Sequence, residues 1–113
     1  MASRIRALVA LDEGVDSNVI QSMLPDNGTI EVVGIINGLE ESWRTLQETE
    51  SDLLIVACEG YSDRALYFID AAVKDQGDRP VVVMTTGSPN GFVRRVFESG
   101  ADDILTLPEP TER

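Results

Sequence analysis

The chain contains no histidine and a single cysteine, Cys58, among its 113 residues. Without histidine, the Ser-His and Cys-His nucleophile pairs and histidine metal sites are excluded, and the usual base near neutral pH is missing. A single cysteine also excludes an internal disulfide. Because Cys58 follows a buried apolar run and has no basic neighbour in the sequence to activate it, we interpret it as a small apolar filler of the core.

Basic residues are scarce: 9 Lys and Arg stand against 20 Asp and Glu, which gives a net charge of −11. This charge opposes direct binding to nucleic acid, where neutralisation of phosphates dominates affinity, and it opposes anionic membrane surfaces. The sequence has no apolar run that approaches the about 20 residues of a membrane helix, and MASRIRALVA does not resemble a signal peptide. We therefore expect a cytoplasmic protein.

What the chain does contain is a regular alternation of apolar runs and helical patterns, with 42% hydrophobic and 26% charged residues. The apolar runs predict strands at residues 5–11, 30–36, 53–56, 81–84 and 103–105. The stretches between them predict helices at residues 15–24, after Gly38 around Leu39, Trp43 and Leu46, at 64–73 and at 91–99. Strict alternation predicts a single α/β domain, a flavodoxin-like three-layer sandwich with a five-stranded parallel sheet in the order 2-1-3-4-5.

The last residues, Pro-Glu-Pro-Thr-Glu-Arg, are typical of the approach to another helix. A five-stranded sheet needs such a helix to cover part of one face. We expect residues 1–113 to be one domain of a longer protein, with the last helix missing or truncated. The alternative is that this face meets a partner.

Three stretches together resemble the CheY-like receiver domain of bacterial response regulators. They are VALDEG at 9–14, DLLIVA at 52–57, and PVVVMTTG with ESGADDILTLP between 80 and 108. The similarity covers the whole chain except a last helix, and GADDILTLP is its most specific part. The overall pattern is also similar to the Flp-pilus assembly ATPases, in which an atypical receiver precedes an ATPase domain.

The resemblance implies a site that transfers a phosphoryl group onto an aspartate of the domain itself. In receivers an acidic pair after the first strand holds Mg²⁺, a Thr or Ser and a Lys bind the phosphoryl oxygens, and an aromatic residue reports the state. Four of the family's positions hold apolar residues here: Ala57 at the acceptor position, Leu11 at the first acidic position, Leu107 at the lysine position and Ile104 at the aromatic position. Three positions retain the family's residue: Asp12, Thr85 and Pro108.

These losses are coordinated, because deleting only one charged group would leave its partners unpaired at an energetic cost. We therefore interpret the chain as a pseudo-receiver: a non-enzymatic domain without a cofactor that acts through protein–protein contact. The alternative is a receiver that is still active through a non-standard acceptor or a small ligand. Asp12, Glu13 and Glu59 are weak candidates for a Mg²⁺ site, and we interpret them as a solvated acidic rim.

A basic pair, Arg94 and Arg95, lies on a predicted helix of this acidic chain, with Asp102 and Asp103 close by in sequence. In receivers the corresponding face often makes dimers, so the two pairs are candidates for a self-complementary interface. The expected partners are a second copy of the chain or a downstream domain of the same protein.

Overall fold

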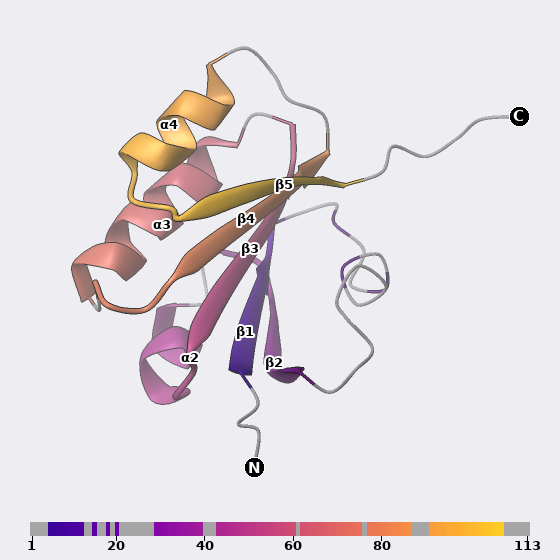
Figure 1. Cartoon of the computed structure of the whole chain (residues 1–113), viewed down its shortest axis with the longest axis vertical. Coiled ribbons are helices and arrows are strands. Elements are labelled where there is room, and N and C mark those ends of the chain that lie inside the picture. Colours follow the sequence, from indigo (N-terminus) through magenta and orange to yellow (C-terminus); the bar gives the residue numbers. More distant parts are fainter. Residues whose placement is uncertain are drawn as a thin grey trace, which may run out of the picture.

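The computed structural model describes residues 5–12, 15, 18, 20, 29–39, 43–60, 62–75, 77–86 and 91–107, without the side chains of residues 43, 86, 106 and 107. Within these residues the elements are β1 (Ile5–Leu11), β2 (Ile30–Asn37), α2 (Trp43–Glu48), β3 (Leu53–Glu59), α3 (Asp63–Asp75), β4 (Val81–Thr86), α4 (Phe92–Glu98) and β5 (Asp103–Leu107) (Figure 1). None of the described helices has the length and apolar character needed to span a bilayer.

The five strands form one parallel sheet in the order β2-β1-β3-β4-β5. This arrangement confirms the predicted α/β class and the flavodoxin-like strand order. Parallel neighbours require a crossover between them. The helices α2, α3 and α4 lie in the connections from β2 to β3, from β3 to β4 and from β4 to β5. Figure 1 shows α3 and α4 together beside the sheet, with α2 below them.

Alternation along the strands divides the apolar side chains between two clusters on opposite faces of the sheet. The larger cluster combines strand residues such as Leu54 and Val83 with residues of α2, α3 and α4, including Leu46, Ile69 and Phe92. The smaller cluster holds Ile20, which lies between β1 and β2 in the sequence, and the side chains that alternate with these along the strands: Ala7, Val9, Leu11, Ile55, Ala57 and Met84. The sheet is therefore buried on both faces at its centre, as a parallel sheet requires.

The strands are longer than predicted at their carboxyl ends. β3 continues beyond Val56 to Glu59, and β4 continues to Thr86, because Cys58 pairs with Thr85 and Glu59 with Thr86. Backbone pairing thus extends past the apolar run from which the strands were predicted. Most of the predicted first helix, residues 15–24, lies outside the described residues. Of its described residues, Ile20 is buried.

Candidate functional site

The position that the resemblance gives to the phosphoryl acceptor lies inside the sheet. Ala57 pairs with Leu11 on one side and with Met84 on the other. These three residues belong to one apolar cluster and are 0%, 1% and 3% exposed, respectively. The strand predicted over residues 53–56 would place Ala57 at its tip. In the structure Ala57 lies within β3, because the strand continues for two more residues. None of the three side chains carries an oxygen, so this part of the described site offers no nucleophile.

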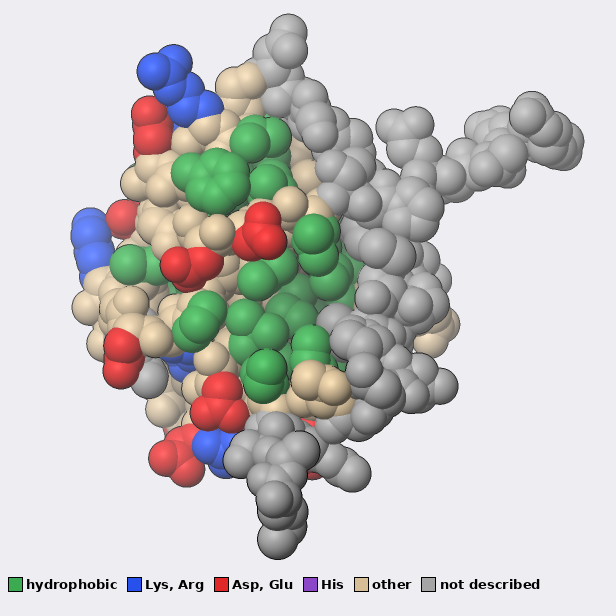
Figure 2. All heavy atoms as spheres, viewed as in Figure 1, with side chains coloured by type: hydrophobic (Ala, Val, Ile, Leu, Met, Phe, Trp, Pro, Cys, Tyr) green, Lys and Arg blue, Asp and Glu red, His purple; other side chains and the backbone are tan. Residues whose placement is uncertain are grey.

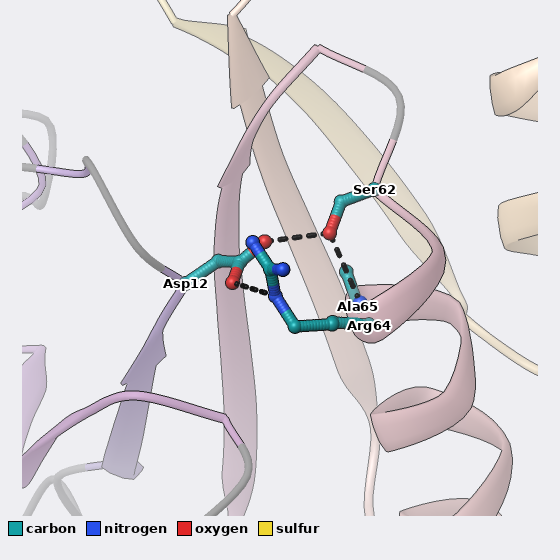
Figure 3. A network of polar contacts seen from close by, with 4 residues as sticks. All are labelled: Asp12, Ser62, Arg64 and Ala65. Carbon is teal, nitrogen blue, oxygen red and sulfur yellow. Dashed lines mark hydrogen bonds and ion pairs between the residues drawn. The ribbon is translucent and has the colours of Figure 1, made fainter.

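The retained acidic residue, Asp12, follows directly after β1, and its backbone N–H donates to the carbonyl of Ala57 over 2.9 Å. Its side chain is buried, with 5% of the residue exposed. Ser62 Oγ donates to Asp12 Oδ2 at 2.6 Å, and Arg64 Nε donates to Asp12 Oδ1 at 2.9 Å (Figure 3). Each carboxylate oxygen therefore has a hydrogen-bond donor, and the negative charge is paired with a guanidinium.

Ser62 has a second role, because it caps the amino end of α3. Its Oγ accepts from the N–H of Ala65 at 3.2 Å (Figure 3). Its carbonyl accepts from the N–H of Leu66 at 3.3 Å. A hydroxyl can donate one hydrogen bond while accepting another, so the same oxygen serves Asp12 and the helix. The start of α3 is thus fixed to the end of β1, and the loop after β3 is held between them.

The described donors do not fit a Mg²⁺ ion, which requires about six oxygen ligands in octahedral geometry. Both oxygens of Asp12 already accept from Ser62 and Arg64. Among the described residues there is no group of three or more acidic, Cys or His side chains that could hold a metal. Glu59 is exposed, and Glu13 lies outside the described residues. Our interpretation of Asp12 as part of a solvated rim was wrong, because Ser62 and Arg64 bury its carboxylate.

Thr85 and Cys58 lie next to each other at the carboxyl ends of β4 and β3. Thr85 is 0% exposed, and its Oγ1 donates to the carbonyl of Gly60 at 3.3 Å. Burial raises the pKa of the Cys58 thiol to about 11, while a hydrogen bond with Thr85 lowers it and the charge of Asp12 raises it further. The cysteine therefore stays protonated near neutral pH and packs as an apolar side chain, as its place in the sequence predicted.

The other positions from the resemblance have mixed outcomes. Ile104 is partly buried against the larger core cluster, on the face that carries α4. Pro108 and the side chain of Leu107 lie outside the described residues.

Each of the proposed interface residues has a contact within the described part of the chain. Arg94 and Arg95 extend from α4 and lie 3.6 Å and 4.0 Å from the carboxylate of Glu98. Asp102 Oδ2 accepts from the N–H of Val81 at 2.8 Å, and Asp103 Oδ1 accepts from the N–H of Ile104. Their role in a dimer stays a prediction.

Sequence reasoning missed Ser62 and Arg64, although both left a signal. Ser62 stands directly before a helical pattern, which is the preferred place of a capping serine. Arg64 is a cation in the first turn of α3, where the helix dipole disfavours positive charge. A base at this position indicates a negative partner elsewhere in the fold, here Asp12.

No family model matches the chain, and no curated protein matches it in sequence. Solved structures do match it. The RcsB response regulator of Salmonella typhimurium is 15% identical with a TM-score of 0.75, covering 92% of this chain but 51% of that one. The receiver domain of NarL from Mycobacterium tuberculosis is 16% identical with a TM-score of 0.73, covering 96% of this chain and 87% of that one. The response regulator domain of Thermotoga maritima CheB is 18% identical with a TM-score of 0.74, covering 95% and 81%.

These likenesses show the CheY-like receiver fold, as the sequence resemblance implied. The chain spans about half the length of the RcsB structure. The further resemblance to the Flp-pilus assembly ATPases is not tested by these structures and stays a prediction.

Proposed function

We propose that this chain is a receiver-type domain that accepts no phosphoryl group and acts by contact with protein partners. The observation that carries the proposal is the apolar environment of Ala57, which packs with Leu11 and Met84 where the reaction needs a carboxylate. Phosphoryl transfer to an aspartate cannot begin without this nucleophile.

The hydrogen bonds of Asp12 support the same proposal. In a receiver this carboxylate would help to hold a divalent cation, but here Arg64 supplies the positive charge from within the chain. An internal guanidinium cannot be exchanged with solvent as a metal ion can. We accordingly propose a domain that uses neither a metal nor another cofactor and catalyses no reaction.

The remaining parts of the proposal concern partners and location. The net charge of −11 disfavours direct contact with nucleic acid, although RcsB structures include complexes with promoter DNA. We propose protein partners in the cytoplasm, either a second copy of the chain or another domain of the same protein. Sedimentation tests the dimer by comparing the protein with a variant that carries Arg94→Glu and Arg95→Glu. If the dimer uses this face, the mass in solution should fall from that of a dimer to that of a monomer in the variant.

Incubation with acetyl phosphate and Mg²⁺, followed by intact mass measurement, tests the central claim. We expect no gain of a phosphoryl group, whereas the isolated receiver domain of RcsB, whose structure was solved with the phosphomimetic BeF3−, is treated in parallel as the comparison. A stoichiometric gain on this chain would overturn the proposal in favour of a receiver with a non-standard acceptor. Mapping the modified residue would then identify that acceptor.

A further inference from the structure

Arg79 is a buried cation at the amino end of the sheet. It stands before β4, next to Pro80, whose carbonyl accepts from the N–H of Leu54 at 3.0 Å. Arg79 is 5% exposed, whereas every other Lys or Arg that the structure describes is exposed. Asp12 follows the carboxyl end of β1, so Arg79 lies at the opposite end of the parallel sheet from the pocket described above.

Two of the three guanidinium nitrogens of Arg79 have no acceptor. Nη1 donates to Ser51 Oγ over 3.4 Å, which is long for a hydrogen bond. Nε and Nη2 are buried and have no hydrogen-bond partner in the described structure. The N–H groups of Nε and Nη2 point the same way along one edge of the planar guanidinium, and such an edge binds both oxygens of a carboxylate. The unmet donors of Arg79 therefore form a single bidentate position.

The acidic residues on either side of the adjoining turn do not occupy this position. Burial lowers the pKa of Arg79, and the charges of Asp75 and Asp78 raise it. Both carboxylates are exposed, and neither forms an ion pair with Arg79 within the described ranges. An ionised group that is removed from water without a partner carries a large desolvation cost. The buried guanidinium thus lacks the anion that would offset this cost.

Several exposed bases do have an acidic partner, although water already solvates them. Three such pairs lie on the surface: Arg6 with Asp52, Lys74 with Asp70, and Arg94 with Glu98. On the face seen in Figure 2, basic side chains stand apart from one another, with acidic side chains near them. The described residues of this face therefore present no cluster of bases that would compete with Arg79 for an anion.

The charge and shape of the position favour one class of anion. A single guanidinium carries one positive charge, which a carboxylate neutralises. A doubly charged phosphate would bring a second negative charge toward Asp75 and Asp78, in a chain whose net charge is −11. The two parallel N–H groups also match the two oxygens of a planar carboxylate.

We propose that Arg79 and Ser51 form the binding site of a small carboxylate. Its two oxygens accept from Nε and Nη2 of Arg79, while Ser51 holds Nη1. Because these donors are covered, the ligand enters when the short connections before β3 and β4 separate, and connections of this kind are the parts of a fold that open most readily. The site goes beyond the protein-contact role proposed above and uses no phosphodonor, so its test is independent of the acetyl phosphate experiment.

Thermal unfolding in sodium acetate, compared with sodium chloride at equal ionic strength, tests the proposal. For a dissociation constant of about 10 mM, about 100 mM acetate should raise the melting temperature by about 6 °C. Arg79→Met, which removes the charge and keeps an unbranched side chain, should lose this response, and the matched Arg94→Met, at a side chain 84% exposed, should keep it.

The same variant tests whether Arg79 is unpaired without the ligand. In chloride, Arg79→Met should melt no lower than the unchanged protein, because it removes an unpaired buried charge. A lower melting temperature would show that Arg79 already has a partner and would overturn the proposal. An absent acetate response, or an equal response in Arg79→Met, would overturn it as well.

NMR spectra of the arginine Nε–H groups locate the bound acetate. The signal that is missing from the Arg79→Met spectrum belongs to Arg79, and acetate should shift it until the change saturates, while the Arg94 signal stays in place. An unmoved Arg79 signal contradicts the proposal. Inorganic phosphate at the same ionic strength should shift it less, and an equal or larger effect would refute the assignment to a carboxylate. A shift on diluting the protein without acetate would exclude a free ligand and identify an acidic side chain of a second copy as the source.

Discussion

Replacing Ser62 with alanine should destabilise the domain more than the loss of an ordinary buried hydroxyl. The change removes the hydrogen bond to Asp12 Oδ2 and the cap on the N–H of Ala65. A lost capping side chain costs about 1 kcal/mol, and a lost hydrogen bond to a charged group costs about 1.5–3 kcal/mol. Because Asp12 is 5% exposed, water replaces the lost donor poorly. We expect the free energy of unfolding to fall by about 3 kcal/mol.

Urea denaturation followed by circular dichroism measures this change, and a thermal melt should show a decrease of about 12 °C, at about 4 °C per kcal/mol. The matched control is Ser62→Thr, which retains a hydroxyl and a capping side chain and should recover most of the stability. A double-mutant cycle with Asp12→Asn isolates the interaction between the two side chains. A loss below about 1 kcal/mol, or full additivity in the cycle, would refute the assignment of Ser62 as a principal partner of the Asp12 carboxylate.

Ala57→Asp places a carboxylate at a 0% exposed position, so urea titration should show a loss of about 3 kcal/mol or more at pH 7 that shrinks toward pH 4; an equal loss at both pH values would show that the carboxylate reaches water. Because the pKa of Cys58 is raised from 9.0 to about 11, the folded protein keeps a proton that the unfolded chain loses. The free energy of unfolding should therefore fall as pH rises from about 9 to 11. The Cys58→Ala variant should lack this contribution to the slope. An unchanged slope in that variant would contradict the argument. Gly100→Ala should lower the free energy of unfolding by about 2 kcal/mol in the same urea assay, because φ is +114° and a Cβ would lie 2.9 Å from Val73 Cγ2. Gly60→Ala, with φ +56° and no atom within 4 Å of the added Cβ, should lower it by about 1 kcal/mol. Equal losses would exclude the contact with Val73.

The sequence sufficed to predict the sheet because each strand contains an apolar run whose burial is decided locally. The runs around Leu54 and Val83 identified β3 and β4, and their alternation with helical patterns predicted the strand order. The ends of the strands were predicted too short, because Glu59 and Thr86 pair through backbone groups that no side-chain pattern reveals.

The site divides in the same way. The absence of a carboxylate at Ala57 is visible in the sequence once the resemblance aligns it. The environment of Asp12 is not, because its partners Ser62 and Arg64 are 50 and 52 residues away along the chain. Whether an acidic residue at a strand end is solvated or buried depends on which loop folds over it, and this is decided by tertiary packing.

The pairing of Asp12 with Arg64 also bears on how such a domain could be regulated. A ligand shifts a conformational equilibrium only when it binds one state better than the other. The carboxylate of Asp12, which could distinguish a bound cation from none, is already paired with the guanidinium of Arg64 on α3, and Ser62 holds the same helix end. If the domain lacks phosphorylation as proposed, a partner that alters its behaviour must act on another surface.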